Sequence, residues 1–396
     1  MSDLVTSKSP SAPTLSMVVA TLGRTVELER LFQSLEAQTR RDFDVVVVDQ
    51  NDDDRLVALM AHWSERLPLR HLHTPGQRGL SVARNRGWPT TSGGILLFPD
   101  DDCWYPAHFV ADALATMERH GADVLSGRAA TPEGRSINGR YELAACRSTR
   151  HNIWTTGIEW MMFFRRAVLE AVGGYSEDVG VGAASPWQAC EGVDIVLRAD
   201  TAGFRCWFDP ALAGHHEEIV TIAPDKRARH KARAYGRGMG HVLRRFGYGP
   251  AAKANWIARP GAGAVVSLLS GRGAKAAYYL QVALGRLEGV TGRLLGWSRR
   301  QGGRPCCLLS HAAMSQNTSF PEMIMVSRQL VMHQSVSAAT RWSFSSNDFS
   351  EAPVLIKHLR SLRRSTERQY RKGVNPGLLI SQDYRARESL YAKGAE

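Results

Sequence analysis

The sequence predicts an α/β fold with a mostly parallel central sheet, followed by a basic helical region. Apolar, β-branched runs at residues 15–20 and 45–48 are typical of strands that are covered on both faces. Apolar residues recur between these runs at helical spacing, which completes a strand–helix–strand unit. After residue 225 the chain becomes strongly basic, and its pattern changes to longer helical stretches.

Acidic and polar residues follow two of the predicted strands at the point where each strand ends. The first group comes after residues 45–48, and the second comes after the apolar run 95–98. Because the carboxyl ends of parallel strands meet at one edge of the sheet, where such sheets bind ligands, we expect a shared site. The first group is residues 49–53 (DQNDD), which begins with Asp49 and Gln50, and the second is Asp100, Asp101 and Asp102.

Three adjacent aspartates repel one another, so we expect a cation beside them. Hard oxygen ligands suit Mg²⁺ or Mn²⁺, which proteins hold with one or two carboxylates and the phosphates of a substrate. A turn at residues 76–79 leads into a short helix, where Arg78, Arg84 and Arg86 are available for phosphates. The chain lacks the Gly-Lys-Ser/Thr signature of a P-loop, so a diphosphate site of another kind is predicted.

Four segments resemble, in this order, the family 2 glycosyltransferases, whose Rossmann-like GT-A fold binds nucleotide-diphospho-sugars. They are residues 19–24 (VATLGR), 47–50 (VVDQ), 83–87 (ARNRG) and 98–102 (FPDDD). The likeness continues to about residue 220, so it implies a GT-A catalytic domain over residues 14–222. The resemblance implies a hexosyltransferase-type enzyme that uses a UDP-, GDP- or dTDP-sugar together with Mg²⁺ or Mn²⁺.

The resemblance also assigns residues to the donor and to the metal. Asp49 would contact the nucleotide base, while Asp100 and Asp102 would hold the ribose and the metal diphosphate. The role of Asp101 depends on the register of the aspartate motif, and either of two adjacent histidines can be the one near the metal. The donor set is Thr21, Arg24, Asp49, Gln50, Arg78, Arg84, Asp100 and Asp101, and the metal set is Asp100, Asp102, His215 and His216.

Family 2 enzymes mostly invert the anomeric centre, which requires a carboxylate that removes the proton of the acceptor hydroxyl. In the family this base usually belongs to a Glu-Asp pair, whereas this chain has Glu191-Gly192. Glu191 is the first candidate for the base, and Asp194, three residues on and on the same helix face, is the second. The alternative is that both acids stabilise the start of a helix through its dipole.

The formal net charge of +12 is concentrated in the second half, where residues 226–287 hold thirteen Lys and Arg and no acid. We expect two helices, at 226–246 and 274–295, separated by a Gly/Pro-rich stretch. Basic helices with an apolar side suit an anionic membrane surface. A basic hairpin packed on the catalytic domain is the competing interpretation, and nucleic acid is not expected as a partner.

The ends of the chain differ from the rest. Residues 1–13 are polar and lack the apolar core of a signal peptide, so we expect a flexible N-terminus of a cytoplasmic protein. Such a protein is peripheral at the membrane if its helical region, residues 223–300, binds lipid. Residues 301–396 are rich in Ser, Arg and Gln without periodicity, which is typical of disorder or of a shifted reading frame. The six cysteines show neither zinc spacing nor a disulfide framework.

These features together predict an inverting glycosyltransferase of polysaccharide or glycoconjugate synthesis. It would move a sugar from a nucleotide-sugar donor to a hydroxyl of a saccharide or lipid-linked acceptor. Two other interpretations stay open. One is a sugar-phosphate nucleotidyltransferase, for which residues 21–24 make a poor phosphate loop. The other is a catalytically silent adaptor for a membrane or a polyanion, which Gly192 would indicate.

Overall fold

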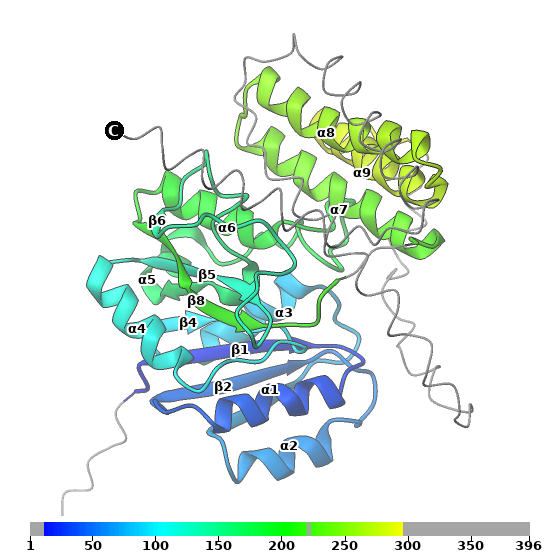
Figure 1. Ribbon diagram of the computed structural model, residues 1–396. Helices are drawn as coiled ribbons and strands as arrows, with labels where there is room; N and C mark the ends of the chain where they lie inside the picture. Colours follow the sequence, from blue (N-terminus) through cyan, green and yellow to red (C-terminus); the bar gives the residue numbers. More distant parts are fainter. Residues whose placement is uncertain (1–11, 220–222, 296–396) are drawn as a thin grey trace, which may run out of the picture. The chain divides into compact units, whose positions relative to one another are not determined.

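The computed structural model describes residues 12–219 and 223–295. Its central feature is an eight-stranded sheet with the strand order β3-β2-β1-β4-β7-β5-β8-β6 (Figure 1). β7 and β6 run antiparallel to their neighbours, and the other pairs are parallel, so the predicted mostly parallel sheet is confirmed. The strands are β1 (Leu15–Thr21), β2 (Phe43–Asp49), β3 (Leu69–His73), β4 (Ile95–Leu97), β5 (Val124–Ala130), β6 (Cys146–Arg147), β7 (Phe163–Arg165) and β8 (Cys206–His215).

Helices cover both faces of the sheet. Helices α1, α2 and α4 pack on the face that carries Met17 and Val47, whereas α3, α5 and α6 pack on the face that carries Val18 and Val46. Because successive residues of a strand point to opposite faces, burial of both faces explains the unbroken apolar sequence of β1 and β2. The helices are α1 (Val26–Glu36), α2 (Val57–Ser64), α3 (Leu80–Gly87), α4 (Phe109–His120), α5 (Arg166–Val172) and α6 (Glu191–Thr201), with short 3₁₀ helices η1 (Trp88–Thr90) and η2 (Glu159–Met161).

Helix α3 approaches β1 and β2 closely at Gly87. A Cβ atom at this position would lie 2.4 Å from Val18 Cγ1 and 2.9 Å from Val48 Cγ2, so a side chain does not fit. Two residues earlier, Asn85 donates to the carbonyl oxygen of Tyr175 and accepts from its amide, both at 2.9 Å. These contacts fix α3 on the sheet, and with it the position of Arg84.

Three further helices follow the sheet (Figure 1). The prediction that a Gly/Pro-rich stretch separates two helices is wrong, because this stretch is itself helical. Pro250 stands in the first turn of its helix, where the missing N–H group is not needed, and the helix continues past Pro260. The three helices are α7 (Lys226–Arg245), α8 (Pro250–Leu269) and α9 (Gly273–Thr291).

Some sequence predictions concern residues that the structure does not describe. The N-terminus up to residue 11 and the tail 301–396 lie outside the described residues. Within residues 12–219 and 223–295, none of the helices combines the length and the apolar character that a bilayer crossing requires. The described cysteines are free thiols: Cys103, Cys146, Cys190 and Cys206.

Helices α7 and α9 pack at a very short distance because glycines face each other across their contact. A Cβ atom at Gly240 would lie 2.2 Å from a backbone carbonyl oxygen of α9, and one at Gly289 would lie 2.2 Å from a carbonyl oxygen of α7. Glu288, 1% exposed, lies in the same interface and pairs with Arg233 at 2.5 Å and Arg237 at 2.6 Å. The two helices therefore form one rigid pair with a buried ionic contact.

We predict that Gly289→Ala destabilises the protein, because the added methyl group forces α9 away from α7. Overpacking of this kind typically costs about 1–3 kcal/mol. The matched control is Gly261→Ala in α8, where nothing lies within 4 Å of the Cβ position. Alanine there should stabilise the helix by about 0.5–1 kcal/mol. Thermal unfolding followed by circular dichroism measures both changes, and equal shifts in the two variants would contradict the close contact.

Candidate active site

The ends of β1, β2, β4 and β8 meet at one edge of the sheet. β1 ends at Thr21 and β2 ends at Asp49, and the two residues are partners in a parallel register. Just beyond β4, Asp100 forms a bridge with Ala20 of β1. On the other side, the backbone of His215 at the end of β8 pairs with Trp104. The aspartate triplet therefore lies between the ends of β1 and β8, at the edge that the sequence predicted for ligand binding.

Asp101 is bound by groups from the β1 side. Thr21 Oγ1 donates to Asp101 Oδ2 at 2.8 Å. Arg24 pairs with Asp101 and also with Asp102, at 2.7 Å to the latter. Asp101 is only 7% exposed, while the side chain of Arg24 is 40% exposed. Asp101 thus anchors the segment, and Arg24 remains accessible from solvent.

His216 is the one of the two predicted histidines that reaches the aspartates. Its Nε2 lies 3.1 Å from Asp102 Oδ1, whereas His215 Nδ1 lies 3.0 Å from the carbonyl oxygen of Ala130. Burial opposes a positive charge on His216, but its contact with Asp102 raises its pKa above the usual value. Burial likewise opposes ionisation of Asp102, but His216 and Arg24 lower its pKa. The two side chains thus stabilise each other as an ion pair.

Arg84 lies fully buried beneath the aspartates and is surrounded by acids. Its guanidinium is 3.2 Å from Asp100 Oδ1 and also pairs with Glu159 of η2. Burial disfavours the charge on Arg84, but Glu159 and the other nearby acids outweigh burial and raise its pKa. The sequence predicted a phosphate contact for Arg84, and the structure places the side chain among carboxylates. Glu159 was absent from the predicted residues because it belongs to none of the recognised motifs.

The contact with Arg84 does not fully stabilise the ionised form of Asp100. Burial raises the pKa of Asp100 to about 6; Arg84 acts in the opposite direction, and Asp102 and Asp101 add to the increase. The side chain is nevertheless 31% exposed. Ionisation of Asp100 is therefore costly in the protein alone, and a cation from solvent has access to its carboxylate.

The donor set fits a divalent cation that is shared with a diphosphate. Among the described residues, no three His, Cys, Asp or Glu side chains are grouped to hold a metal ion without further ligands. A Mg²⁺ or Mn²⁺ ion bound with a nucleotide needs only one or two carboxylates, because phosphate and water oxygens complete its shell. Asp102 and the partly exposed Asp100 supply such carboxylates, and His216 lies beside them.

The two acids that the sequence proposed as the base lie in different environments. Glu191, at the start of α6, is 3% exposed and accepts a hydrogen bond from the amide of Val181 at 3.3 Å. Asp194 is 0% exposed and pairs with Arg198 at 2.8 Å and with Arg245 of α7 at 3.1 Å. Asp194 is therefore enclosed in an ion-pair network that joins α6 to α7.

At the end of β2, the predicted donor residues contact their neighbours. Asp49 is 1% exposed, accepts from the side chain of Asn51 at 2.7 Å and lies 3.0 Å from His71 Nε2. Arg78 donates to the backbone carbonyl of Gln50, which ties the turn before α3 to the end of β2. These residues form an ordered extension of the acidic edge.

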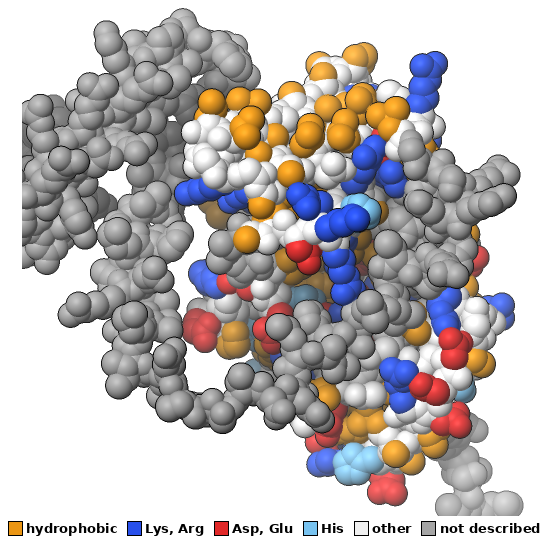
Figure 2. Space-filling view, turned by 90° about the vertical axis from the view of Figure 1, so that its right-hand side faces the viewer, with side chains coloured by type: hydrophobic (Ala, Val, Ile, Leu, Met, Phe, Trp, Pro, Cys, Tyr) orange, Lys and Arg blue, Asp and Glu red, His pale blue; other side chains and the backbone are white. Residues whose placement is uncertain are grey.

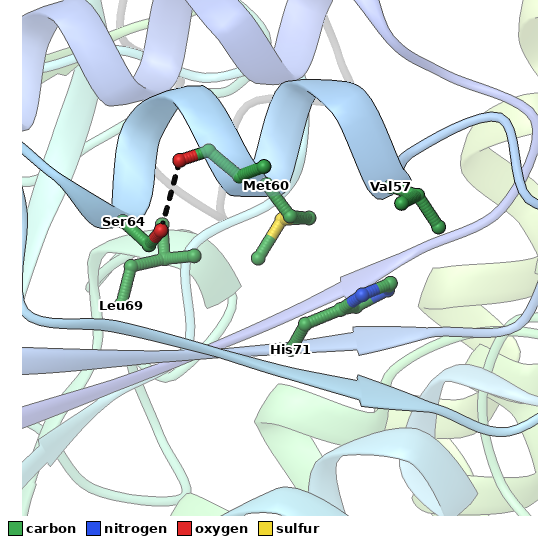
Figure 3. Close-up of a pocket in the computed structure, with 6 residues that line it drawn as sticks. Val57, Met60, Ser64, Leu69 and His71 are labelled. Atoms are coloured by element: carbon green, nitrogen blue, oxygen red, sulfur yellow. Dashed lines mark hydrogen bonds between the residues drawn. The ribbon is translucent and has the colours of Figure 1, made fainter.

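A pocket lies next to this extension, between α2 and the edge strand β3 (Figure 3). His71 of β3 and Met60 of α2 line its opposite sides, and the contact of His71 with Asp49 links it to the end of β2. None of the predicted site residues lines this pocket, whereas a second pocket includes Arg78. The linings are Val57, Met60, Ala61, Ser64, Leu69 and His71 for the first and Arg78, Val82, Glu177, Asp178, Ala184 and Ser185 for the second.

The fold and its acidic edge define the class of protein: an α/β domain suited to a nucleotide diphosphate. The family follows from sequence comparison, because residues 16–173 match the family model described as Glycosyl transferase family 2. The matched segment runs from β1 to the end of α5 and includes the three aspartates of the acidic edge. The predicted family, enzyme class and fold are confirmed, and they displace the nucleotidyltransferase interpretation.

Curated relatives are similar over parts of their length. The glycosyltransferase AglE of Haloferax volcanii is 24% identical over 211 residues, which are 52% of this chain and 67% of that protein. A dolichol-phosphate mannosyltransferase of Pyrococcus furiosus is 25% identical over 28% of this chain and 32% of its own length. A PGL/p-HBAD biosynthesis glycosyltransferase of Mycobacterium bovis is 27% identical over 54% of this chain and 77% of its own. The chain therefore spans less than two thirds of some of these relatives.

Solved structures with a similar fold include two nucleotide-sugar complexes. One is the mannosyltransferase PcManGT from Pyrobaculum calidifontis with GDP-Man and Mn²⁺, at a TM-score of 0.47 and 17% identity over 70% of this chain and 88% of that one. The other is S. aureus TarS 1-349 with UDP-GlcNAc, at a TM-score of 0.45 and 17% identity over 70% of this chain and 92% of that one. Both similarities concern the fold alone.

We predict that Asp100→Asn stabilises the metal-free protein above pH 6. The pKa of Asp100 rises from 3.8 to about 6 on folding, so the wild type loses stability as the pH increases through this range. Asparagine does not ionise, so the variant avoids this loss. Its free energy of unfolding should exceed that of the wild type by on the order of 1 kcal/mol, a value that allows for partial solvent screening.

Thermal unfolding at pH 7.5 measures the gain, and added MnCl₂ with UDP or GDP should stabilise the wild type more than Asp100→Asn. The control is Asp53→Asn, because Arg55 lowers the pKa of Asp53 to about 2 and its ionised form is already favoured. A wild type that is as stable as Asp100→Asn at this pH would contradict the cost of ionising Asp100.

Proposed function

We propose that the protein transfers a sugar from a nucleotide-sugar donor to a hydroxyl of a saccharide or lipid-linked acceptor, with inversion at the anomeric carbon. The observation that carries this proposal is the partly exposed carboxylate of Asp100, whose ionisation burial disfavours, beside the carboxylate of Asp102 at the edge of the sheet. A nucleotide along this edge would place its base at Asp49 and its diphosphate at Asp100 and Asp102. The dolichol-phosphate mannosyltransferase among the relatives supports the lipid-linked class of acceptor.

The residues around the diphosphate have distinct roles in this proposal. Asp100 and Asp102, with His216 beside them, would hold Mg²⁺ or Mn²⁺, and the ion would supply positive charge for the leaving diphosphate. Thr21 fixes Asp101 and thereby the course of the aspartate segment. Arg24, partly exposed beside Asp102, is placed to exchange its carboxylate contacts for a phosphate. Gln50 and Arg78 would shape the base end.

We predict that Asp102→Ala weakens metal-dependent donor binding. The substitution removes one proposed metal ligand and the partner of His216. Binding of UDP-GlcNAc and GDP-mannose is measured by calorimetry with MnCl₂ and with EDTA, and hydrolysis is followed as release of nucleoside diphosphate. We expect one donor to be selected by the wild type and its affinity to fall at least about tenfold in the variant.

The matched control is Asp112→Ala on α4, an acid outside the cluster in the first turn of its helix. Its donor affinity should equal that of the wild type. If Asp102→Ala kept both affinity and turnover, the metal assignment would be wrong. A folded wild type that bound none of the donors would favour the silent adaptor.

We also propose that the α7–α9 region contacts an anionic membrane surface. Packing of α7 on the catalytic domain agrees with the hairpin interpretation, since Arg245 pairs with Asp194. The end of α8 is different, because its apolar side chains are exposed. Figure 2 shows hydrophobic side chains gathered with Lys and Arg over this part of the molecule. The exposed apolar residues are Val265, Val266, Leu268 and Leu269, at 58%, 63%, 66% and 83%.

We predict that Leu268→Ser with Leu269→Ser weakens binding to anionic vesicles. Burial of two leucines in the lipid interface contributes on the order of 2 kcal/mol, so affinity should fall at least about tenfold. Co-sedimentation with phosphatidylglycerol vesicles measures this affinity, and phosphatidylcholine vesicles test how much the lipid charge contributes to it. The control is Leu143→Ser, which removes a 97% exposed leucine from the catalytic domain. Equal binding of both variants would contradict the proposal.

A further inference from the structure

The acid that is missing from α6 leaves a space, and another carboxylate fills it. A Cβ atom at Gly192 would lie 2.8 Å from Cγ, 3.0 Å from Cβ and 3.2 Å from Cδ of Glu159. Real Cβ atoms do not approach carbon atoms so closely, so a side chain at position 192 and Glu159 in its present position exclude each other. The side chain of Glu159 therefore occupies the volume that a side chain at position 192 would need.

Glu159 reaches this space from a different element of the fold. It belongs to η2, which leads into β7 in the middle of the sheet, whereas Gly192 lies in the first turn of α6. Helix α6 begins with Glu191, so Glu159 and Glu191 together form a pair of acids next to Arg84, contributed by two elements instead of by adjacent residues. Interactions with both acids raise the pKa of Arg84.

Glu159 is the accessible member of the acids around the start of α6. Its side chain is 21% exposed, while Glu191 is 3% exposed and Asp194 is 0% exposed. Arg84 binds one carboxylate oxygen of Glu159, and within the described residues no hydrogen bond is made by the other oxygen, Oε2. An acceptor hydroxyl can therefore donate to Glu159 without displacing a protein group.

Arg84 connects this acid to the proposed donor side of the site. The guanidinium contacts Glu159 through one nitrogen and Asp100, at 3.2 Å, through another. Glu159 is thereby held one side chain away from the carboxylates that would face the diphosphate. Burial raises the pKa of Glu159, Arg84 partly offsets this, and Glu191 adds to the increase. A carboxylate of raised pKa is a stronger acceptor for a hydroxyl proton.

We infer that Glu159 takes the place of the missing acid as the catalytic base. Glu191 has a positioning role, because it holds the loop at Val181 through the amide of that residue. This inference rests on the proposed glycosyl transfer. In the step, Glu159 removes the proton of the acceptor hydroxyl while the hydroxyl oxygen bonds to the anomeric carbon. The bond from that carbon to the diphosphate oxygen breaks, and its electron pair leaves with the nucleoside diphosphate. The protonated Glu159 then returns its proton to solvent.

The test uses the full chain with MnCl₂ and UDP-GlcNAc or GDP-mannose, with water or an added sugar as acceptor. Glu159→Gln keeps an oxygen for Arg84 but cannot take up the proton. We expect its turnover to fall by about 10²–10⁴-fold, while donor affinity stays within about threefold of wild type. Glu170→Gln, an exposed acid on α5, is the matched control and should keep full turnover.

A second variant moves the carboxylate back to α6. Glu159→Ala removes the Cγ and Cδ atoms at 2.8 and 3.2 Å and leaves the Cβ contact at 3.0 Å, which a shift of a few tenths of an ångström relieves. Adding Gly192→Asp then supplies a carboxylate from the helix. We expect this double variant to exceed Glu159→Ala in turnover by at least about tenfold. A melting temperature close to that of Glu159→Ala shows that the comparison concerns folded protein.

The outcomes separate this inference from the proposed function. Turnover by wild type that persists in Glu159→Gln, or that is lost together with donor affinity, overturns the role of Glu159 and leaves the transferase proposal in place. Absence of any gain in the double variant overturns the role too. A folded wild type that binds neither donor overturns the proposed function and the inference with it.

Discussion

The structure of this site depends on the repulsion among carboxylates that the fold gathers at one edge of a parallel sheet. Asp100, Asp101 and Asp102 follow β4 after Phe98 and Pro99, and burial raises the pKa of Asp100 and of Asp101. Three cations limit the cost of ionisation: Arg84 from below, Arg24 from the side and His216 from the end of β8. Burial nevertheless raises the pKa of Asp100 to about 6, so a divalent cation bound together with a diphosphate would stabilise the ionised carboxylate.

Arg84 shows how the fold supports the chemistry. Its helix is fixed by Gly87, which permits close approach to β1 and β2, and by Asn85, which binds the backbone at Tyr175. Arg84, the residue before Asn85, extends into the interior, where it contacts Asp100 and Glu159. A surface arginine would be free to follow a ligand, whereas a buried one holds its acids at fixed positions. One motif thus provides both a packing contact and an electrostatic centre.

Much of the fold could be predicted from the sequence because its signals are local. The apolar runs of β1 and β2 and the polar residues at their ends required only patterns of neighbouring residues. Helix α8 was predicted wrongly for a related reason: Gly and Pro weaken the local helical signal, and the close approach of α9, whose Tyr279 would lie 3.3 Å from a Cβ atom at Gly263, is visible only in the structure. Long-range packing overrides local preference there.

The site could be predicted in part, and the missing part is informative. Asp100, Asp102 and His216 lie together as expected, although the sequence could not distinguish His216 from His215. Glu159 has no motif around it, and its importance follows only from its position against Gly192. The departure from the Glu-Asp pair was the one signal in the sequence, since a lost acid at a site that needs one suggests a substitute elsewhere.

The most direct test of the account is a crystal structure of the protein with Mn²⁺ and UDP or GDP, in which anomalous scattering locates the metal. The account predicts one manganese peak in contact with the carboxylates of Asp100 and Asp102, with the diphosphate bound to it and the base near Asp49. Manganese bound away from these aspartates, or a nucleotide bound elsewhere than at the ends of β1, β2 and β4, would contradict it.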